Sequence, residues 1–194
     1  KSVAIDEERL NLLAQGEFDQ MVQTLRNLGI HVLVVEDDAN LKLPDAIFPN
    51  NWFSTHAEGY VITYPMCTEN RRRERRMDIL DLLFHTFHFS KRYSMVEFEN
   101  NQQYLEGTGS LILDRVHKIA YACLSPRTDA QLLHVFSELT GYENIFFHAF
   151  DDHQTAIYHT NVMMALGTDF VVICSESIPH AERERILQKL KATG

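Results

Sequence analysis

The sequence predicts an α/β fold in which a unit of strand, turn, strand, helix and strand is repeated along the chain. Three hairpin turns, at Gly59, Asp114 and Gly167, follow one another 55 and then 53 residues apart. Short apolar stretches flank each turn, and a segment with helical periodicity follows each hairpin. A repeat of this length is typical of a propeller or another array of supersecondary units, because one unit cannot cover its own apolar face.

The repeat divides the 194 residues into two whole units, near 45–100 and 101–152, and two partial ones, near 1–44 and 153–194. A chain of this length can bury one substantial core, so we expect a single domain, 1–194. A closed ring would need further units, and we therefore expect that the C-terminal ones are missing from this sequence.

The first half-unit is a helix followed by a strand. Apolar residues form a helical stripe within Glu7–Leu28, and Gly29 is suited to end the helix. Ile30–Val35 is apolar and rich in β-branched residues, which predicts a strand. The acidic turn Glu36–Asp38 leads into the next unit.

The second unit contains a strand at Tyr60–Tyr64, a helix and a strand near Tyr93–Phe98. Asn70 is placed to cap the helix, whose apolar positions run from Met77 to Phe87.

The third unit repeats the pattern with strands at Ser110–Leu113 and Ile119–Cys123. A helix near Asp129–Leu139 ends at Gly141, and Ile145–Phe150 is the next strand.

The last partial unit has strands at Thr160–Leu166 and Phe170–Cys174. Pro179 suits the first turn of a final helix that runs to about Lys191.

Composition and charge argue against several function classes. The formal net charge of −9 disfavours nucleic acid or an anionic membrane as a partner. No apolar run approaches the roughly 20 residues of a spanning helix, and Lys1–Ile5 lacks the layout of a secretion signal. Three widely spaced cysteines fit a reducing compartment better than a disulfide framework. We therefore expect a cytoplasmic protein.

Other histidines and arginines have ordinary interpretations. The pairs His85–His88 and His148–His153 have no third ligand at a suitable spacing, so we expect no metal site. His56 is expected at the surface, with a position that lines the cavity as the alternative. The basic run Arg71–Arg76 is expected to be a solvated face that pairs with acidic neighbours, such as Glu97, Glu99 or the Glu36–Asp38 turn.

Each hairpin carries polar residues near the start of its first strand. These are Asn50 and Asn51, then Glu106, then His159 and Asn161. Equivalent positions in a ring of repeats face the same axis, which predicts one shared cavity. Gly107 and Gly109 follow Glu106, and residues without side chains allow the backbone to approach a ligand closely.

Four segments in this order resemble the amidinotransferase/arginine deiminase/dimethylarginine dimethylaminohydrolase superfamily. They are Asp45-Ala-Ile-Phe-Pro-Asn-Asn51, Glu106-Gly-Thr-Gly109, Ser125-Pro-Arg-Thr128 and Tyr158-His-Thr-Asn161. The resemblance implies the pentein fold, an α/β propeller of five modules, of which about three are in this chain. The resemblance is closest to the citrulline-utilisation hydrolase branch.

The resemblance also implies roles for individual residues. His159 matches the catalytic histidine, and Glu106 matches the carboxylate that binds the substrate's nitrogen end. Arg127 matches the residue that grips the carboxylate of the amino acid, for which a planar guanidinium is suited. Asp45 is expected to contact the cavity.

Two positions depart from the family pattern. Asn51 stands where a guanidinium-binding aspartate is usual, and Asn161 replaces the aspartate of the deiminases' His-x-Asp. A cationic guanidinium needs carboxylates around it, whereas a neutral ureido group can be complemented by an amide. We therefore expect citrulline or a related ureido compound as the substrate.

The implied reaction is covalent catalysis by a cysteine and a histidine, without a cofactor, giving ornithine, ammonia and carbon dioxide. None of the three cysteines matches the nucleophile. Cys123 and Cys174 are expected as buried small hydrophobes and Cys67 as a loop thiol. The nucleophile is thus expected outside this segment, which should be inactive by itself.

Two alternatives remain open. One is a guanidine-acting relative, namely a deiminase, a dimethylaminohydrolase or an amidinotransferase. The other is a non-catalytic propeller that binds a ribosomal subunit or another protein. The expected partner is a small-molecule substrate, and a homodimer is possible.

Overall fold

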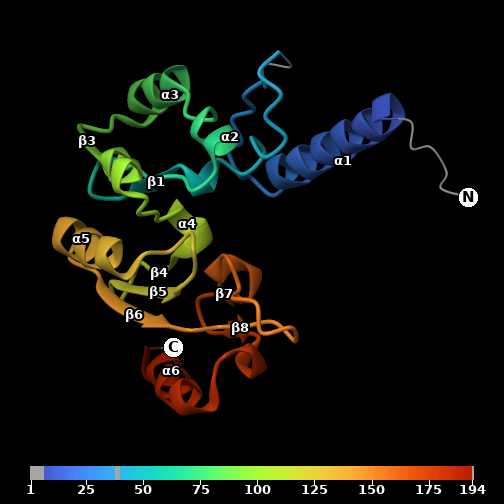
Figure 1. Cartoon of the computed structure of the whole chain (residues 1–194). Helices are drawn as coiled ribbons and strands as arrows, with labels where there is room; N and C mark the ends of the chain where they lie inside the picture. The colour runs from blue at the N-terminus through green and yellow to red at the C-terminus, as the bar shows by residue number, and fades with distance from the viewer. Residues whose placement is uncertain (1–6, 38–39, 194) are drawn as a thin grey trace, which may run out of the picture. The chain divides into compact units, whose positions relative to one another are not determined.

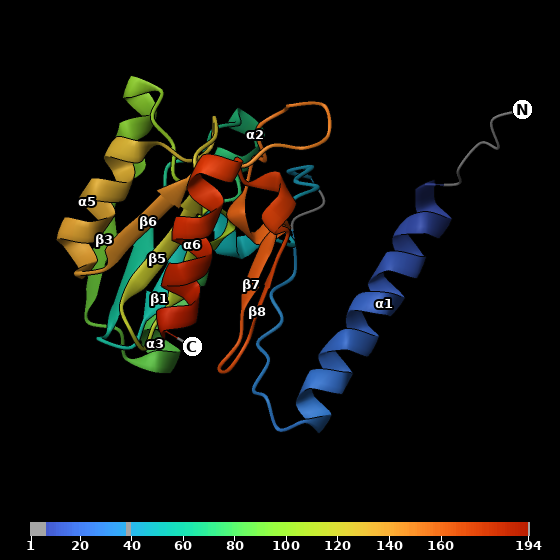
Figure 2. The ribbon, with the colours of Figure 1, turned by 90° about the horizontal axis from the view of Figure 1, so that it is seen from below.

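The computed structural model describes residues 7–37 and 40–193, and its contacts group them into two compact units, 7–37 and 40–193. Lys1–Ile5, for which we expected no secretion signal, lies outside the described residues, as does Asp38 of the predicted acidic turn. Figures 1 and 2 show the chain in two views.

The first unit consists of helix α1 (Glu7–Asn27) and an irregular segment. Gly29 follows the helix with a φ of +81°, a conformation that favours glycine, so the predicted helix end is confirmed. The predicted strand at Ile30–Val35 is wrong, because this segment has no regular structure. A strand depends on a neighbouring strand for its backbone hydrogen bonds, and apolar composition does not supply that partner.

The second unit contains eight strands in three sheets, within the part of the chain that the structure describes. The strands are β1 (Phe53–His56), β2 (Tyr60–Thr63), β3 (Lys91–Ser94), β4 (Ile112–Asp114), β5 (Ile119–Cys123), β6 (Glu143–Phe147), β7 (Met164–Leu166) and β8 (Val171–Ile173). The helices are α2 (Glu69–Arg72), α3 (Met77–Phe87), α4 (Gly107–Ser110), α5 (Ala130–Thr140) and α6 (His180–Thr193). Short 3₁₀ turns lie at η1 (Pro49–Asn51), η2 (Val96–Asn101), η3 (Thr160–Val162) and η4 (Ser175–Ser177).

The same topology occurs twice. In the first sheet β1 and β2 form an antiparallel hairpin and β3 runs parallel to β2 after the crossover through α3. In the second sheet β4 and β5 form the hairpin and β6 runs parallel to β5 after α5. The hairpin of β7 and β8 is followed by α6. The predicted mixed α/β architecture is confirmed, and no closed ring of units forms among the described residues.

Helix α5 forms for local reasons that the sequence displays. The Asp129 carboxylate accepts hydrogen bonds from the backbone N–H groups of Gln131 and Leu132 at its start, and Gly141 ends it with a φ of +75°. Strand β5 also has the predicted bounds. Figure 1 shows α5 beside the second sheet, and Figure 2 shows α6 alongside β6.

Several predicted elements differ because tertiary contacts override local patterns. The strand expected near Tyr93–Phe98 ends at Ser94 and is followed by the 3₁₀ turn η2, and the strand expected from Thr160 starts at Met164, after η3. The single helix expected after Asn70 is split into α2 and α3, and Thr68 and Arg76 occupy their N-cap positions. The strand expected from Ser110 starts later, because Gly107–Ser110 forms the helical turn α4.

Strand β5 joins the two largest parts of the core. Ala120 and Ala122 pack in one hydrophobic cluster with residues of the first sheet, including Ile62. Ile119 and Tyr121 pack in the other cluster, with residues of the third sheet and of α6. Because successive side chains of a strand point to opposite faces, β5 is buried on both sides and the sheets pack one after another.

His56 is buried at 2% exposure, so its predicted surface position is wrong. Its Nε2 atom lies 2.9 Å from the Ser54 hydroxyl, and its ring stacks on that of Tyr60 at 4.5 Å. Burial, reinforced by the Arg115 guanidinium, lowers the pKa of His56 to about 4. The ring is therefore neutral at pH 7 and is kept inside as a small aromatic core residue.

We expect the protein to lose on the order of 2 kcal/mol of stability between pH 6.5 and pH 4 because of His56. In this window the unfolded chain binds a proton that the folded histidine does not, so stability decreases as the pH falls. Denaturant unfolding at pH 7 and pH 4.5 measures the change. His56→Gln should reduce the difference, whereas His85→Gln, which alters an exposed histidine, should leave it unchanged. Equal pH dependence in all three proteins would contradict this account.

Candidate active site

The buried pair of Glu106 and His159 lies at the centre of the site. Nε2 of His159 is 2.7 Å from Oε2 of Glu106, and His159 and Glu106 are 4% and 0% exposed. Glu106 directly precedes the helical turn α4, and His159 directly precedes η3. Two residues that are 53 positions apart are thus brought into contact by the packing of successive units.

Three groups hold the Glu106 carboxylate in place. His159 contacts Oε2, the backbone N–H of Cys67 donates to Oε1 at 2.8 Å, and the Arg127 guanidinium donates to Oε2 at 3.2 Å. Burial opposes ionisation, but the hydrogen bonds from His159 and Cys67 and the positive charge of Arg127 together lower the pKa of Glu106. The carboxylate is therefore negatively charged at neutral pH.

Asn51 lies at the end of η1 and is 3% exposed. Its Oδ1 accepts a hydrogen bond of 2.9 Å from Nη1 of Arg71, whereas its Nδ2 has no hydrogen-bond partner among the described residues. A Cβ atom on Gly109 would lie 2.0 Å from this Nδ2 and 2.9 Å from Nδ1 and Cε1 of His159. The structure thus packs Asn51 and His159 against Gly109, where no side chain would fit, and brings His159 into contact with Glu106.

The basic run contains a functional candidate that the sequence analysis missed. Arg71 is 5% exposed and forms an ion pair of 2.9 Å with Glu74, which is 3% exposed, so its predicted position on a solvated face is wrong. The predicted pairing of the run with acidic neighbours is confirmed for Arg75, which forms an ion pair with Glu99. Residues three positions apart on a helix can form an ion pair, so the spacing of Arg71 and Glu74 is consistent with one. The run has five arginines in six positions, and the sequence alone does not indicate which of them pairs with Glu74.

Arg127, Asp45 and Asn161, the other predicted site residues, lie at different positions relative to the Glu106–His159 pair. Arg127 is near the pair, where it contacts Glu106 and lies over the Tyr158 ring at 5.3 Å. Asp45 is half-buried, and its backbone carbonyl accepts a hydrogen bond from Arg71. Asn161 is exposed in η3, and no side-chain contact between it and Glu106 or His159 is found among the described residues.

The cysteines have different environments. Cys123 is buried, as predicted, whereas Cys174 is exposed, because β8 has no third strand beside it among the described residues. Burial raises the pKa of the Cys67 thiol, and the nearby Glu106 carboxylate adds to the effect. Burial also raises the pKa of Cys123. Neither environment activates a thiolate.

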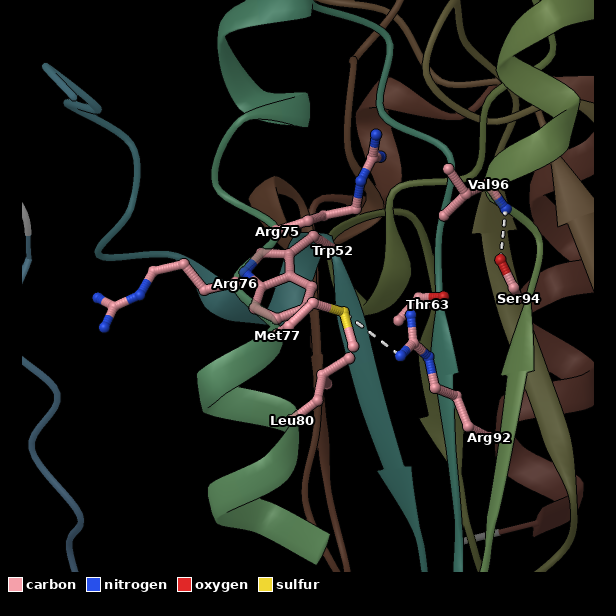
Figure 3. Close-up of a pocket in the computed structure, with 9 residues that line it drawn as sticks. All are labelled: Trp52, Thr63, Arg75, Arg76, Met77, Leu80, Arg92, Ser94 and Val96. Atoms are coloured by element: carbon pink, nitrogen blue, oxygen red, sulfur yellow. Dashed lines mark hydrogen bonds between the residues drawn. The ribbon is translucent and has the colours of Figure 1, made fainter.

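Two clefts lie away from this cluster. Figure 3 shows one of about 200 Å³ between α3 and the strands β2 and β3, lined by Trp52, Leu80 and Arg92 among others. The second, of about 550 Å³, is lined in part by Phe87, Phe89 and Arg115. Neither cleft includes Asn51, Glu106 or His159.

Two other kinds of site are not found within residues 7–37 and 40–193. Within those ranges, no three residues of the types His, Cys, Asp and Glu are grouped so as to hold a metal ion. Of the helices described there, none has the length and apolar character needed to cross a bilayer.

A family model described as "N,N dimethylarginine dimethylhydrolase, eukaryotic" matches residues 1–194 of the chain. The chain belongs to this family. The match confirms the resemblance to the superfamily of amidinotransferases and dimethylarginine dimethylaminohydrolases that the four sequence segments indicated. A comparison with curated proteins finds no match.

Solved structures of similar fold agree with this membership. The apo structure of ArgZ, an arginine dihydrolase of the ornithine–ammonia cycle in cyanobacteria, superposes with a TM-score of 0.70 at 16% identity, covering 90% of this chain and 26% of that one. A substrate-bound N-terminal domain of ArgZ gives 0.69 at 16% identity, covering 90% and 59%. A dimethylarginine dimethylaminohydrolase adduct with 4-chloro-2-hydroxymethylpyridine gives 0.63 at 14% identity, covering 90% and 65%. The chain spans less than two thirds of these proteins, and at such identities the likeness shows the fold.

Proposed function

We propose that this chain carries the substrate-binding part of a hydrolase that cleaves a C–N bond of a ureido or guanidino amino acid. The observation that supports this most is the buried contact of 2.7 Å between Glu106 and His159 beside the unpartnered amide nitrogen of Asn51. Buried polar groups in a folded protein usually have hydrogen-bond partners. A buried N–H₂ group without a partner, next to an acid–base pair, is therefore expected where a ligand binds. Membership of the family supports the same class of reaction.

His159 is proposed to move protons and Glu106 to orient the substrate. An imidazole can protonate the departing amine and then activate water, because its ordinary pKa lies near neutrality. The Glu106 carboxylate retains unused lone pairs beside its three contacts, so it can also accept an N–H of the substrate. Arg127, with its side chain partly exposed at 27%, is proposed to bind the carboxylate of the amino acid.

The nucleophile is proposed to be a cysteine outside these 194 positions. Cys67 and Cys123 have raised pKa values, which disfavour the thiolate needed for attack. We therefore expect the chain by itself to bind substrate and to release no ammonia from citrulline. Turnover by the chain alone would contradict this assignment of the nucleophile.

We propose citrulline as the substrate, giving ornithine, ammonia and carbon dioxide. Asn51 in place of an aspartate removes a negative charge that a guanidinium would require. Asn161 is exposed and gives this preference no support. A second candidate is a guanidino substrate, because the family description names dimethylarginine and similar folds include an arginine dihydrolase. The incomplete propeller, the cytoplasmic location and a homodimer remain predictions.

Calorimetric titration of the chain with citrulline, arginine and dimethylarginine tests the proposal. We expect one of these compounds to bind, and Glu106→Gln to weaken binding about tenfold or more, because a hydrogen bond to a charged group is lost. Glu97→Gln alters an exposed glutamate and should leave binding unchanged. Absence of binding for all three compounds would overturn the proposal and favour a non-catalytic protein that binds a macromolecular partner.

A further inference from the structure

The side-chain hydroxyl of Ser110 joins the turn that carries Glu106 to the segment that carries Arg127. Ser110 is the last residue of α4 and is 0% exposed. Its Oγ accepts a hydrogen bond of 3.0 Å from the backbone N–H of Glu106 and donates one of 3.0 Å to the backbone carbonyl of Arg127. The Thr128 hydroxyl donates to the same Oγ at 2.8 Å. Two residues of the candidate site are thus held, through their backbones, by one buried hydroxyl.

The chemistry of these partners decides how the Ser110 hydroxyl is oriented. A backbone carbonyl only accepts, so the single proton of the hydroxyl is directed to Arg127. A backbone N–H only donates, so one lone pair of Oγ faces Glu106, and the second lone pair accepts the proton of Thr128. The hydroxyl therefore has its one donor and both of its acceptor positions in use, which leaves it no capacity to bind a substrate.

The backbone carbonyl of Ser110 connects the same turn to the segment that carries His159. The hydroxyl of Thr160, the residue after His159, donates to this carbonyl at 2.5 Å. It also accepts a hydrogen bond of 2.8 Å from the backbone N–H of Cys123, at the end of β5. Thr160 is 0% exposed. His159 is therefore anchored, through its neighbour in the chain, to both Ser110 and the second sheet.

The contact of 2.7 Å between Glu106 and His159 joins segments that are distant in the chain, so it depends on how both segments are held. Catalytic groups need to be kept within about 0.5 Å of their productive geometry by hydrogen bonds from the residues behind them. Buried hydrogen-bond networks whose groups have partners make the attached segments rigid. The hydroxyls of Ser110 and Thr160 supply such hydrogen bonds on both sides of the contact.

We propose that the buried hydroxyls of Ser110 and Thr160 position the Glu106–His159 pair. The inference rests on the proposed function, to which it adds two positioning residues that do not touch the substrate. Without the Ser110 hydroxyl, the backbone N–H of Glu106 keeps a hydrogen bond of 3.3 Å to the Arg127 carbonyl, which is longer than either bond to the hydroxyl. Without the Thr160 hydroxyl, the segment of His159 loses its bond to Ser110. Either loss loosens the pair.

The test removes one hydroxyl at a time and measures binding of citrulline, arginine and dimethylarginine by calorimetry. Ser110→Ala and Thr160→Val, in which valine keeps the shape of threonine, should each weaken binding about tenfold. Thr160→Ser keeps the hydroxyl and should retain the affinity of the wild type. The matched control is Ser137→Ala, which removes a hydroxyl that donates to the backbone carbonyl of Tyr142 at 2.5 Å in α5. It should leave binding unchanged.

The titration of the Glu106 carboxyl separates positioning from a purely structural role. Burial opposes ionisation of this carboxyl, while the hydrogen bond from His159 and the charge of Arg127 lower its pKa. When the pair is loosened, burial remains and the stabilising contacts weaken. The pKa of Glu106, measured by nuclear magnetic resonance, should therefore rise in Ser110→Ala and Thr160→Val. It should stay at the wild-type value in Thr160→Ser and in Ser137→Ala.

A purely structural role predicts lower stability in the hydroxyl-free variants with no change in the Glu106 titration, and that result would overturn the inference. If Ser110→Ala does not fold, the comparison of Thr160→Val with Thr160→Ser decides it. If the wild-type chain binds none of the three compounds, the proposed function fails. The Glu106 titration still tests the positioning by Ser110 and Thr160 in that case, because it needs no ligand.

Discussion

Replacing Glu74 by alanine is expected to lower the free energy of unfolding by about 3–5 kcal/mol. The substitution leaves the Arg71 guanidinium, 5% exposed, without its counter-charge in the interior. Burial raises the pKa of Glu74 in spite of the hydrogen bond and charge of Arg71, so the intact pair contributes little net stability. The large cost comes from removing one partner only. A loss of this size is a large part of the roughly 5–15 kcal/mol that stabilise a typical domain.

Denaturant unfolding of the wild type, Glu74→Ala and Glu69→Ala measures this effect. Glu69 lies in α2 at an exposed position, so its replacement should change the free energy of unfolding by less than about 0.5 kcal/mol. The double replacement by glutamine at positions 71 and 74 removes both charges together and should cost less than Glu74→Ala alone. Similar losses for Glu74→Ala and Glu69→Ala would show that Arg71 finds another partner or reaches water.

Gly109→Ala is expected to weaken ligand binding about a hundredfold, because displacements near 1 Å at a reacting site have effects of this order. The added methyl group would lie 2.0 Å from Nδ2 of Asn51 and 2.9 Å from the His159 ring, so one or both side chains must move. Asn51 cannot move freely, because Arg71 holds its oxygen.

Calorimetry with citrulline and arginine checks this prediction, and Gly16→Ala is the matched control. Gly16 lies in helix α1, and a methyl group added there would have no described atom within 4 Å beyond its own helical turn. Its replacement should therefore not affect binding and should favour the helix by roughly 0.5–1 kcal/mol. Undiminished binding in Gly109→Ala would place the ligand away from Asn51 and His159.

Much of the fold was predictable because its signals are local. The bounds of β5 follow from a short apolar run, and the ends of α5 follow from a capping aspartate and a glycine. The contact between Glu106 and His159 followed from the spacing of the repeat together with the family resemblance. The split between α2 and α3, and the absence of a strand at Ile30–Val35, depend on neighbours that are distant in the sequence. A local pattern does not specify such neighbours.

The sequence by itself determined the mixed α/β class and the family, and it predicted that Glu106 and His159 lie close together, as the structure has them. Only the tertiary structure decided that Arg71 and Glu74 are buried, that His56 is a neutral core residue, and that Asn51 turns its oxygen to Arg71 and leaves its nitrogen without a hydrogen-bond partner among the described residues. The reason is physical. Residue types and their spacing are properties of the chain, whereas burial, pKa and the orientation of an amide depend on which side chains the fold places around each group.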